Sequence, residues 1–452
     1  MAPYDLILRA GSLVSGDGVA VSDIAIADGR IVAVEAEIAG QAREEFDATG
    51  LHLFPGVVDP HVHFNEPGRT EWEGWATGSR ALAAGGGTTC CEMPLNALPP
   101  TIDGPAFDAK CDAAATQSVV DFALWGGLVP GNLDRLDELA ARGVVGFKAF
   151  MSQSGTPDFE AADDLTLYEG MTRAARLGVI VAVHAENDTI TSRLAQRAVA
   201  AGKTGVRDYL ASRPIIAEVE AIGRAITFAE ETGCALHVVH VSTGRGVAAV
   251  TAARARGVDV TCETCPHYLV FTEEDVEAIG ALAKCAPPIR SAAERDALWQ
   301  LLETGEIALI ASDHSPAPPE MKQHDDVFQI WGGISGIQST LPIMLSDGHH
   351  GRGLSLSRVA AVTATNAARR FRLPNKGRIA PGFDADLALV DLGADQTPRP
   401  DDLHDRHRQS PYAGRTFRGR VVRTLLRGET IYLNGAIVAK PVGRLVRPEH
   451  RT

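Results

Sequence analysis

Two histidines separated by one residue, His61 and His63, stand at the end of an apolar run that begins at Phe54. Successive side chains of a β-strand point to opposite faces, so residues two apart share a face and can bind one ion together. A lone His-x-His pair is weak evidence, because histidines at strand ends often only hydrogen-bond to neighbouring groups or water. The pair therefore suggests a metal site, and its weight depends on the other candidate ligands.

The same pattern, an apolar run that ends in a potential ligand, recurs four times further along the chain. The runs 143–148, 179–184, 235–240 and 307–313 end in Lys148, His184, His240 and Asp313. The carboxyl ends of parallel strands meet at one edge of a sheet, and active sites of α/β barrels lie there. We therefore expect one site that gathers all six residues.

Four histidines and one aspartate form a suitable ligand set for zinc, manganese, cobalt or nickel, and the sequence does not choose among these metals. A catalytic site with one zinc ion usually has only three protein ligands. Five such residues therefore favour two ions, which need a bridging group between them.

Lys148 has three possible roles. Burial in an apolar strand lowers the pKa of an amine, and a neutral amine can react with carbon dioxide to give a carbamate, an anion able to bridge two ions. Alternatively, the stem of the lysine packs while its ammonium group reaches solvent, or the amine forms a Schiff base. The sequence by itself leaves all three open.

Residues 56 to about 370 alternate between strand-like and helix-like segments. Several helix-like segments, such as 165–177 and 216–232, stop at a glycine, which enters the left-handed conformation without strain. This alternation predicts a parallel sheet, and the intervals between candidate ligands fit β/α units of about 30 residues. We expect an α/β fold with a (β/α)8 TIM-like barrel over residues 56–374, its ligands on strands 1, 4, 5, 6 and 8.

Short strand-like runs also occur at both ends of the chain. Asp28-Gly29 near the start and Asn434-Gly435 near the end lie between apolar runs, and both dipeptides are typical of β-hairpin turns. Chain ends usually lie close together. We therefore expect residues 1–55 and 375–452 to form one composite β-sandwich, into which the barrel is inserted.

The chain has 452 residues, of which 45% are hydrophobic and 22% charged, as in ordinary globular proteins. The net charge of −14 argues against a nucleic-acid partner. The sequence shows neither a secretory signal nor a long apolar segment, so we expect a cytoplasmic protein without a membrane partner. The seven cysteines predict reduced buried thiols, and Cys262 and Cys265 are expected in the core.

Together these motifs resemble the cyclic amidohydrolases, a group that includes dihydroorotase, dihydropyrimidinase (hydantoinase) and allantoinase. The resemblance rests on His61-Val-His63, Lys148, His184, His240 and Ser312-Asp313-His314. Within this group, the chain closely resembles bacterial allantoinases in the runs 65–74, 92–96, 262–268, 284–290 and 331–338. The similarity extends from Asp5 to about residue 440.

The resemblance implies a metal-dependent hydrolase with a binuclear centre in a distorted barrel. It implies that His61, His63 and Asp313 hold one divalent ion, zinc being the first expectation, and that His184 and His240 hold the other. Lys148, as N6-carboxylysine, would bridge the ions. Hydroxide would attack a ring carbonyl, and Asp313, the catalytic residue, would pass its proton to the departing ring nitrogen.

The expected substrate follows from positions where the groups differ. Dihydroorotases place an arginine at the position of Asn65 and an asparagine at that of Ala286 to bind a carboxylate, and both are absent here. Hydantoinases use a tyrosine in the loop after the lysine strand, and residues 151–156 contain none. We therefore expect hydrolysis of allantoin to allantoate in purine breakdown. Asn96 and Ser315 are candidate substrate contacts, although each could equally be a turn residue.

Two alternatives stay open. One is a hydantoinase of broad specificity, and the other is a non-catalytic scaffold relative, although such relatives typically lose metal ligands. The resemblance further implies a homotetramer. Three other sites are interpreted as structural: His349-His350 as an exposed loop, His237 as a core residue or a support for the ligands, and His267 as a structural residue.

Overall fold

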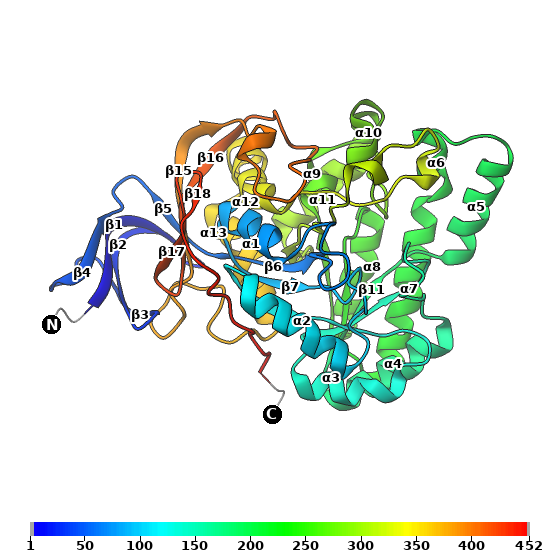
Figure 1. The fold of residues 1–452 in the computed structure, drawn as a ribbon, viewed down its shortest axis with the longest axis horizontal. Helices are drawn as coiled ribbons and strands as arrows, with labels where there is room; N and C mark the ends of the chain where they lie inside the picture. The colour runs from blue at the N-terminus through cyan, green and yellow to red at the C-terminus, as the bar shows by residue number, and fades with distance from the viewer. Residues whose placement is uncertain (1–3, 450–452) are drawn as a thin grey trace.

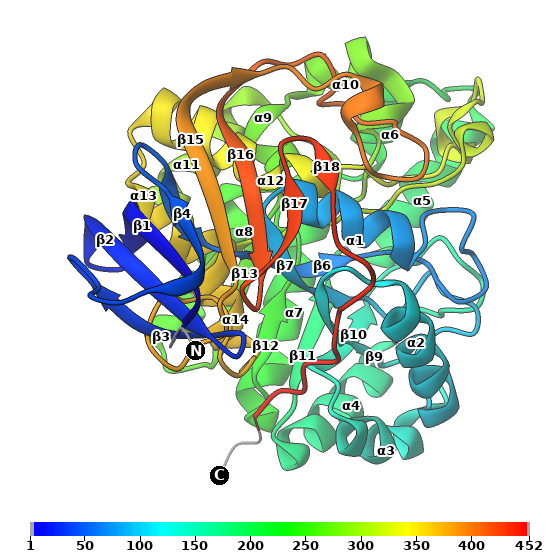
Figure 2. The same cartoon turned by 60° about the vertical axis from the view of Figure 1, so that its left-hand side comes forward.

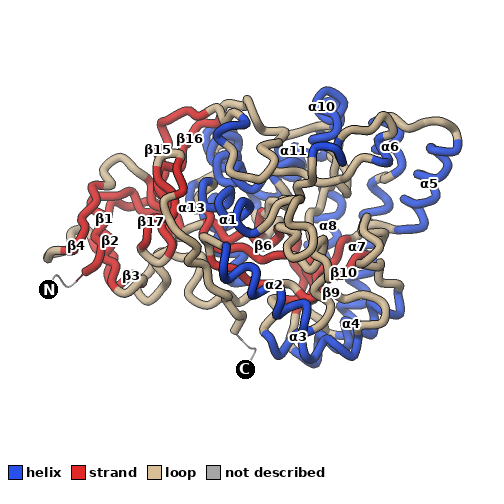
Figure 3. The backbone as a smooth tube through the Cα atoms, viewed as in Figure 1, coloured by secondary structure: helices blue, strands red, loops and turns tan. Residues whose placement is uncertain are grey.

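The computed structural model describes residues 4–449. Strands from the two chain ends lie together at one side of the molecule, and most helices surround a second group of strands at the other side (Figures 1 and 3). The helices are α1 Trp75–Ala84, α2 Gly104–Gln117, α3 Leu136–Arg142, α4 Asp164–Leu177, α5 Asp188–Ala200, α6 Val206–Ser212, α7 Ile215–Thr232, α8 Gly244–Ala255, α9 Pro266–Val270, α10 Glu273–Ile279, α11 Ala292–Thr304, α12 Thr340–Ile343, α13 Leu356–Ala360 and α14 Asn366–Arg370.

Within the described residues, strands of both chain ends pair in one nine-stranded sheet (Figure 2). Its strands are β1 Tyr4–Ser15, β2 Gly18–Ala27, β3 Arg30–Glu35, β4 Ala42–Asp47, β5 His52–Pro55, β15 Leu387–Gln396, β16 Phe417–Leu426, β17 Glu429–Leu433 and β18 Ala436–Ile437. The hairpins β2–β3 and β17–β18 turn at Asp28-Gly29 and Asn434-Gly435, as the sequence predicted. The pairing of β15 with β5 joins the two chain ends.

The remaining strands form two parallel sheets, of which one has the order β6-β7-β8 and the other β14-β13-β12-β11-β10-β9. These strands are β6 Val57–Val62, β7 Gly87–Glu92, β8 Asp121–Leu124, β9 Gly126–Gly127, β10 Gly146–Phe150, β11 Ile180–His184, β12 Leu236–Val238, β13 Val260–Thr264 and β14 Leu309–Ile310. Only Trp125 separates β8 from β9, and a parallel bridge joins Val62 to His314, which follows β14.

The predicted signals for helix ends and buried strands are confirmed. Gly143, Gly178 and Gly233 follow α3, α4 and α7 with φ values of 87°, 66° and 69°, which only glycine adopts without strain. Every residue of β6, β10 and β11 is buried, as expected for parallel strands covered on both faces. A polar side chain in one of these strands is therefore removed from water.

Two other sequence predictions have different outcomes. Cys262 and Cys265 lie in the hydrophobic core, as predicted. His350 is exposed, as predicted, and His349 is half-buried. The prediction of a loop there is wrong, because both residues end a π-helix, η6 Met344–His350, whose buried Met344 and Leu345 hold it against the core. In the part of the chain that the structure describes, no helix is long and apolar enough to span a membrane.

A buried cluster of charges joins the nine-stranded sheet to the parallel strands. Lys376 Nζ lies 2.6 Å from Asp121 at the start of β8, and 2.7 and 3.0 Å from Asp386 and Asp384, which precede β15. Burial lowers the pKa of Lys376, but the three carboxylates outweigh burial and raise it.

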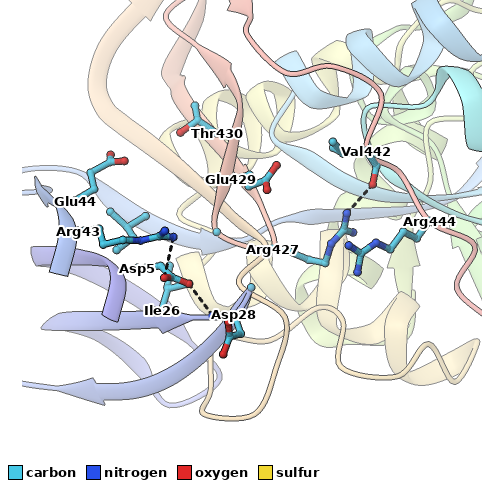
Figure 4. Close-up of a pocket in the computed structure, with 13 residues that line it drawn as sticks. Asp5, Ile26, Asp28, Arg43, Glu44, Arg427, Glu429, Thr430, Val442 and Arg444 are labelled. Atoms are coloured by element: carbon cyan, nitrogen blue, oxygen red, sulfur yellow. Dashed lines mark hydrogen bonds and ion pairs between the residues drawn. The ribbon is translucent and has the colours of Figure 1, made fainter. Parts of the chain in front are cut away.

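Beside this charge cluster lies a hollow lined by residues of both chain ends, including Asp28 and Arg427 (Figure 4). None of the candidate metal ligands lines this hollow.

Lys376→Met should destabilise the fold. The change leaves buried carboxylates without their cation, and breaking a buried ion pair in this way costs about 3–5 kcal/mol. Denaturant unfolding followed by circular dichroism should show a lower midpoint, whereas the exposed Lys203→Met should leave it unchanged. An unaltered midpoint for Lys376→Met would show that the joint does not stabilise the fold.

Candidate metal centre

The structure brings all six candidate ligands to the same edge of the parallel strands. His61 lies in β6 and His63 directly after it, Lys148 lies in β10, and His184 ends β11. His240 and Asp313 follow the short strands β12 and β14. The four histidines and Lys148 are buried, whereas the side chain of Asp313 is 13% exposed.

The first half of the centre consists of His61, His63 and Asp313. The Nε2 atoms of the two histidines lie 3.3 Å apart, and Asp313 Oδ1 lies 3.2 Å from one and 3.4 Å from the other. Two imidazole nitrogens and one carboxylate oxygen thus face a common point, which is the geometry of ligands around one cation.

The second half consists of His184 and His240. His184 Nδ1 lies 3.0 Å from His240 Nε2, and the two rings meet at 72°. The centroids of the His240 and His61 rings are 5.4 Å apart, so the two halves are neighbours.

Lys148 is fully buried, and its Nζ has no hydrogen-bond partner within residues 4–449. Burial lowers the pKa of this amine to about 7, although Glu263 and Asp313 act in the opposite direction. A substantial fraction of the amine is therefore neutral near pH ~7, as carbamate formation requires. Burial also excludes the interpretation in which its ammonium group reaches solvent.

Hydrogen bonds to the outer nitrogen atoms orient the first pair of rings. His61 Nδ1 donates to Glu263 Oε1 at 2.6 Å, and His63 Nδ1 donates to the Leu95 carbonyl at 2.9 Å. With the proton on Nδ1, each Nε2 presents a lone pair. The other Glu263 oxygen lies 3.0 Å from His237 Nε2, so His237 supports a ligand through Glu263.

A different carboxylate orients His184. His184 Nε2 lies 2.9 Å from Glu186 Oε2, which leaves Nδ1 to face His240. Arg213 donates to both Glu186 oxygens, at 2.5 and 3.1 Å. Burial alone would raise the pKa of Glu186, but Arg213 and His184 hold it below its usual value. Sequence analysis did not identify Glu186 and Glu263 as residues that support the ligands. Each is a single acidic residue near the end of a strand, and such a residue alone does not show which histidine it contacts.

The donor set fits divalent cations. Burial lowers the pKa values of His61 and His240 well below the usual value, and the charge of Lys148 contributes, so these rings are neutral. The Nε2 atoms of His61 and His63 face each other without a proton and repel, and a cation between them would remove the repulsion. His240 and Asp313 also adopt positive φ values of 39° and 45°, a strained conformation common at functional sites.

The candidate substrate contacts lie beside this centre. Asn96 follows Leu95, whose carbonyl holds His63, and the Asn96 side chain donates to Asn65 Oδ1 at 3.0 Å. Ser315 lies two residues after Asp313 and is buried. His267 is also close: one of its ring nitrogens, Cys265 Sγ and a carboxylate oxygen of Asp313 lie within 4.8 Å of one another.

A sequence model of the Amidohydrolase family matches residues 52–431. The chain belongs to the amidohydrolase family. Together with the group formed by His61, His63 and Asp313, membership of this family indicates a divalent-metal cofactor.

Similar proteins cover the whole length of this amidohydrolase. The allantoinase of Rubrobacter xylanophilus is 62% identical over 449 residues, which is 99% of either chain. The allantoinase of Deinococcus radiodurans is 55% identical over 98% of this chain and 99% of its own. Among solved structures, the L-hydantoinase (dihydropyrimidinase) of Arthrobacter aurescens has a TM-score of 0.96 and 38% identity, covering 98% of this chain and 100% of its own. The dihydropyrimidinase of Brevibacillus agri has a TM-score of 0.91 and 30% identity, over 99% of either chain.

Glu186→Gln should weaken metal binding without unfolding the protein. Glutamine keeps one acceptor oxygen and carries no charge, so the bond that Glu186 Oε1 accepts from Arg213 is lost and His184 is held less firmly. Losses of this kind reduce metal affinity about 10–100-fold, which chelator competition would measure. Glu169→Gln, an exposed change on α4, is the control, and equal affinities for the two variants would contradict the orienting role.

Proposed function

We propose that this amidohydrolase opens the hydantoin ring of allantoin to give allantoate. The observation that carries the proposal is the convergence of His61, His63, Asp313, His184 and His240 around a buried lysine. The relatives named allantoinase, 62% and 55% identical over nearly the whole chain, support the choice of allantoin.

In the proposed centre, His61, His63 and Asp313 would hold one divalent ion, and His184 and His240 would hold the other. Lys148, carboxylated on Nζ, would supply the anionic group between them, and its buried amine without a hydrogen-bond partner among residues 4–449 supports this role. Zinc is the proposed metal, with manganese, cobalt and nickel as alternatives. Such ions, when bound, supply hydroxide near neutral pH and polarise a carbonyl group.

Asp313 is the proposed catalytic residue. Its Oδ1 faces both rings of the first half, and its side chain is exposed more than the neighbouring ligands. From this position the carboxylate can accept a proton at the metal centre and deliver it to the departing ring nitrogen.

The surroundings of the centre suit an uncharged ring. Asn65 and Ala286 carry no cationic group that would bind a substrate carboxylate, and the nearby Arg69 is paired with Asp158 at 2.7 Å. We propose Asn96 and Ser315 as substrate contacts, supported by their positions beside His63 and Asp313. The alternative function is a hydantoinase of broad specificity, and the similarity to the Arthrobacter aurescens structure fits a hydantoinase.

We further propose that residues 56–374 form a distorted (β/α)8 barrel, and that residues 1–55 and 375–452 form a composite β-sandwich. The bridge from Val62 to His314 supports closure of the two parallel sheets into one barrel. A cytoplasmic homotetramer that binds neither nucleic acid nor membrane completes the proposal.

The function is tested by ring opening of allantoin, hydantoin, dihydrouracil and dihydroorotate, with metal-loaded protein in bicarbonate. We expect the largest kcat/KM for allantoin and none for dihydroorotate, because neither Asn65 nor Ala286 supplies a cation for its carboxylate. Faster turnover of hydantoin or dihydrouracil would establish the hydantoinase alternative. No turnover of any ring would leave the scaffold interpretation.

Carbamate formation on Lys148 is tested separately by NMR with isotopically labelled bicarbonate. Because the pKa of Lys148 is about 7, the neutral fraction of its amine rises through that pH. At fixed dissolved carbon dioxide, the carbamate signal of metal-free protein should increase between about pH 6 and 8, well below the usual lysine range near ~10.4. Lys148→Met is the control without a signal. A signal that appears only near pH ~10 would contradict the bridging role.

A further inference from the structure

The centre of this inference is His267, which sequence analysis interpreted as structural. It lies in α9, directly after β13, at the same edge of the parallel strands as the metal ligands. Its residue exposure is 1%, and neither ring nitrogen has a hydrogen-bond partner among residues 4–449. A buried imidazole with both nitrogens unpaired destabilises the folded state, so packing alone does not account for this histidine.

The surroundings of His267 show what would satisfy it. A ring nitrogen of His267 lies within 4.8 Å of an Asp313 carboxylate oxygen and of Cys265 Sγ, yet no hydrogen bond joins His267 to either residue. The separation suits a polar atom that contacts both the imidazole and the carboxylate. Asp313 is the group that reaches the departing nitrogen in the proposed reaction, so the atom that contacts both belongs to that part of the substrate.

We propose that His267 is a catalytic residue that contacts the substrate, with the ring nitrogen that lies near Asp313 hydrogen-bonding to the ring urea next to the bond that breaks. A neutral imidazole has one donor nitrogen and one acceptor nitrogen on different sides of its ring, so one of them can pair with a C=O or an N–H of a cyclic ureide. The inference rests on the proposed function and extends it from the metal ligands to recognition of the ring.

A metal ion at Cys265, His267 and Asp313 is the competing interpretation. It would need a thiolate, and burial raises the pKa of the Cys265 thiol well above its usual value. The neutral thiol is a weak ligand, so the geometry points to the substrate instead.

The test compares the metal-loaded native enzyme with His267→Leu and His267→Gln. Leucine fills the site without polar atoms, and glutamine keeps a donor and an acceptor. Tyr268→Phe, next to His267 in α9, is the control, since it keeps the ring and removes the hydroxyl that donates to the Pro287 carbonyl. The measurements are kcat and KM for allantoin and for hydantoin, which shares the ring but lacks the ureido tail, together with metal content and Tm.

We expect His267→Leu to lower kcat/KM about 10–100-fold for both rings, as loss of hydrogen bonds to a bound substrate does. Its metal content should be unchanged. Its Tm should be equal or higher, because an apolar group replaces an unpaired polar one. His267→Gln should recover most of the activity, and Tyr268→Phe should retain it.

Four results would overturn the inference. The first is unchanged kinetics in His267→Leu, and the second is a lower Tm of this variant that accounts for its lost activity. The third is loss of a metal ion from His267→Leu. The fourth is an effect on allantoin but not on hydantoin, which would place the contact at the ureido tail. If the native enzyme opens hydantoin but not allantoin, the proposed substrate is wrong, and the hydantoin rates still decide the role of His267. If it opens neither ring, both proposals fail.

Discussion

The convergence of unprotonated nitrogen atoms on a buried lysine is the interaction on which the rest of the centre depends. His61 and His63 have Nδ1 paired with an acceptor, so their Nε2 atoms present lone pairs to each other where water cannot screen the repulsion. The folded chain by itself gains nothing from this arrangement, and divalent cations make it favourable. The surrounding structure must therefore hold the ligands in place at a cost in stability.

Buried carboxylates perform that task. Glu263 accepts from His61 and from His237, and Glu186 accepts from His184 while paired with Arg213. These contacts decide which nitrogen of each ring faces inward: Nε2 for His61 and Nδ1 for His184. His61 and His184 thus use opposite ring nitrogens, each orientation fixed by a different carboxylate.

The backbone at the centre also gives up stability to position functional side chains. His240 and Asp313 hold positive φ values where the chain leaves a strand, which aims their side chains inward at an energetic cost. Contacts far from the centre offset such costs. The ion pairs of Lys376 connect β8 to the segment before β15. The sheet built from both chain ends therefore stabilises the parallel strands that carry the ligands.

The sequence by itself determined the candidate ligands, the order of strands and helices, and the hairpins at both ends. Apolar periodicity and glycine stops are local signals, so runs such as 179–184 identify both a buried strand and the ligand at its end. Only the tertiary structure decided which nitrogen of each histidine faces inward, and that Glu186, Glu263 and Arg213 orient the rings. It also overturned the loop at His349-His350 and showed that His267 is buried beside Asp313 without a hydrogen-bond partner among residues 4–449. These features arise from contacts between residues far apart in the chain, such as His61 and Glu263, and no local pattern of residue types encodes the burial and distances of such contacts.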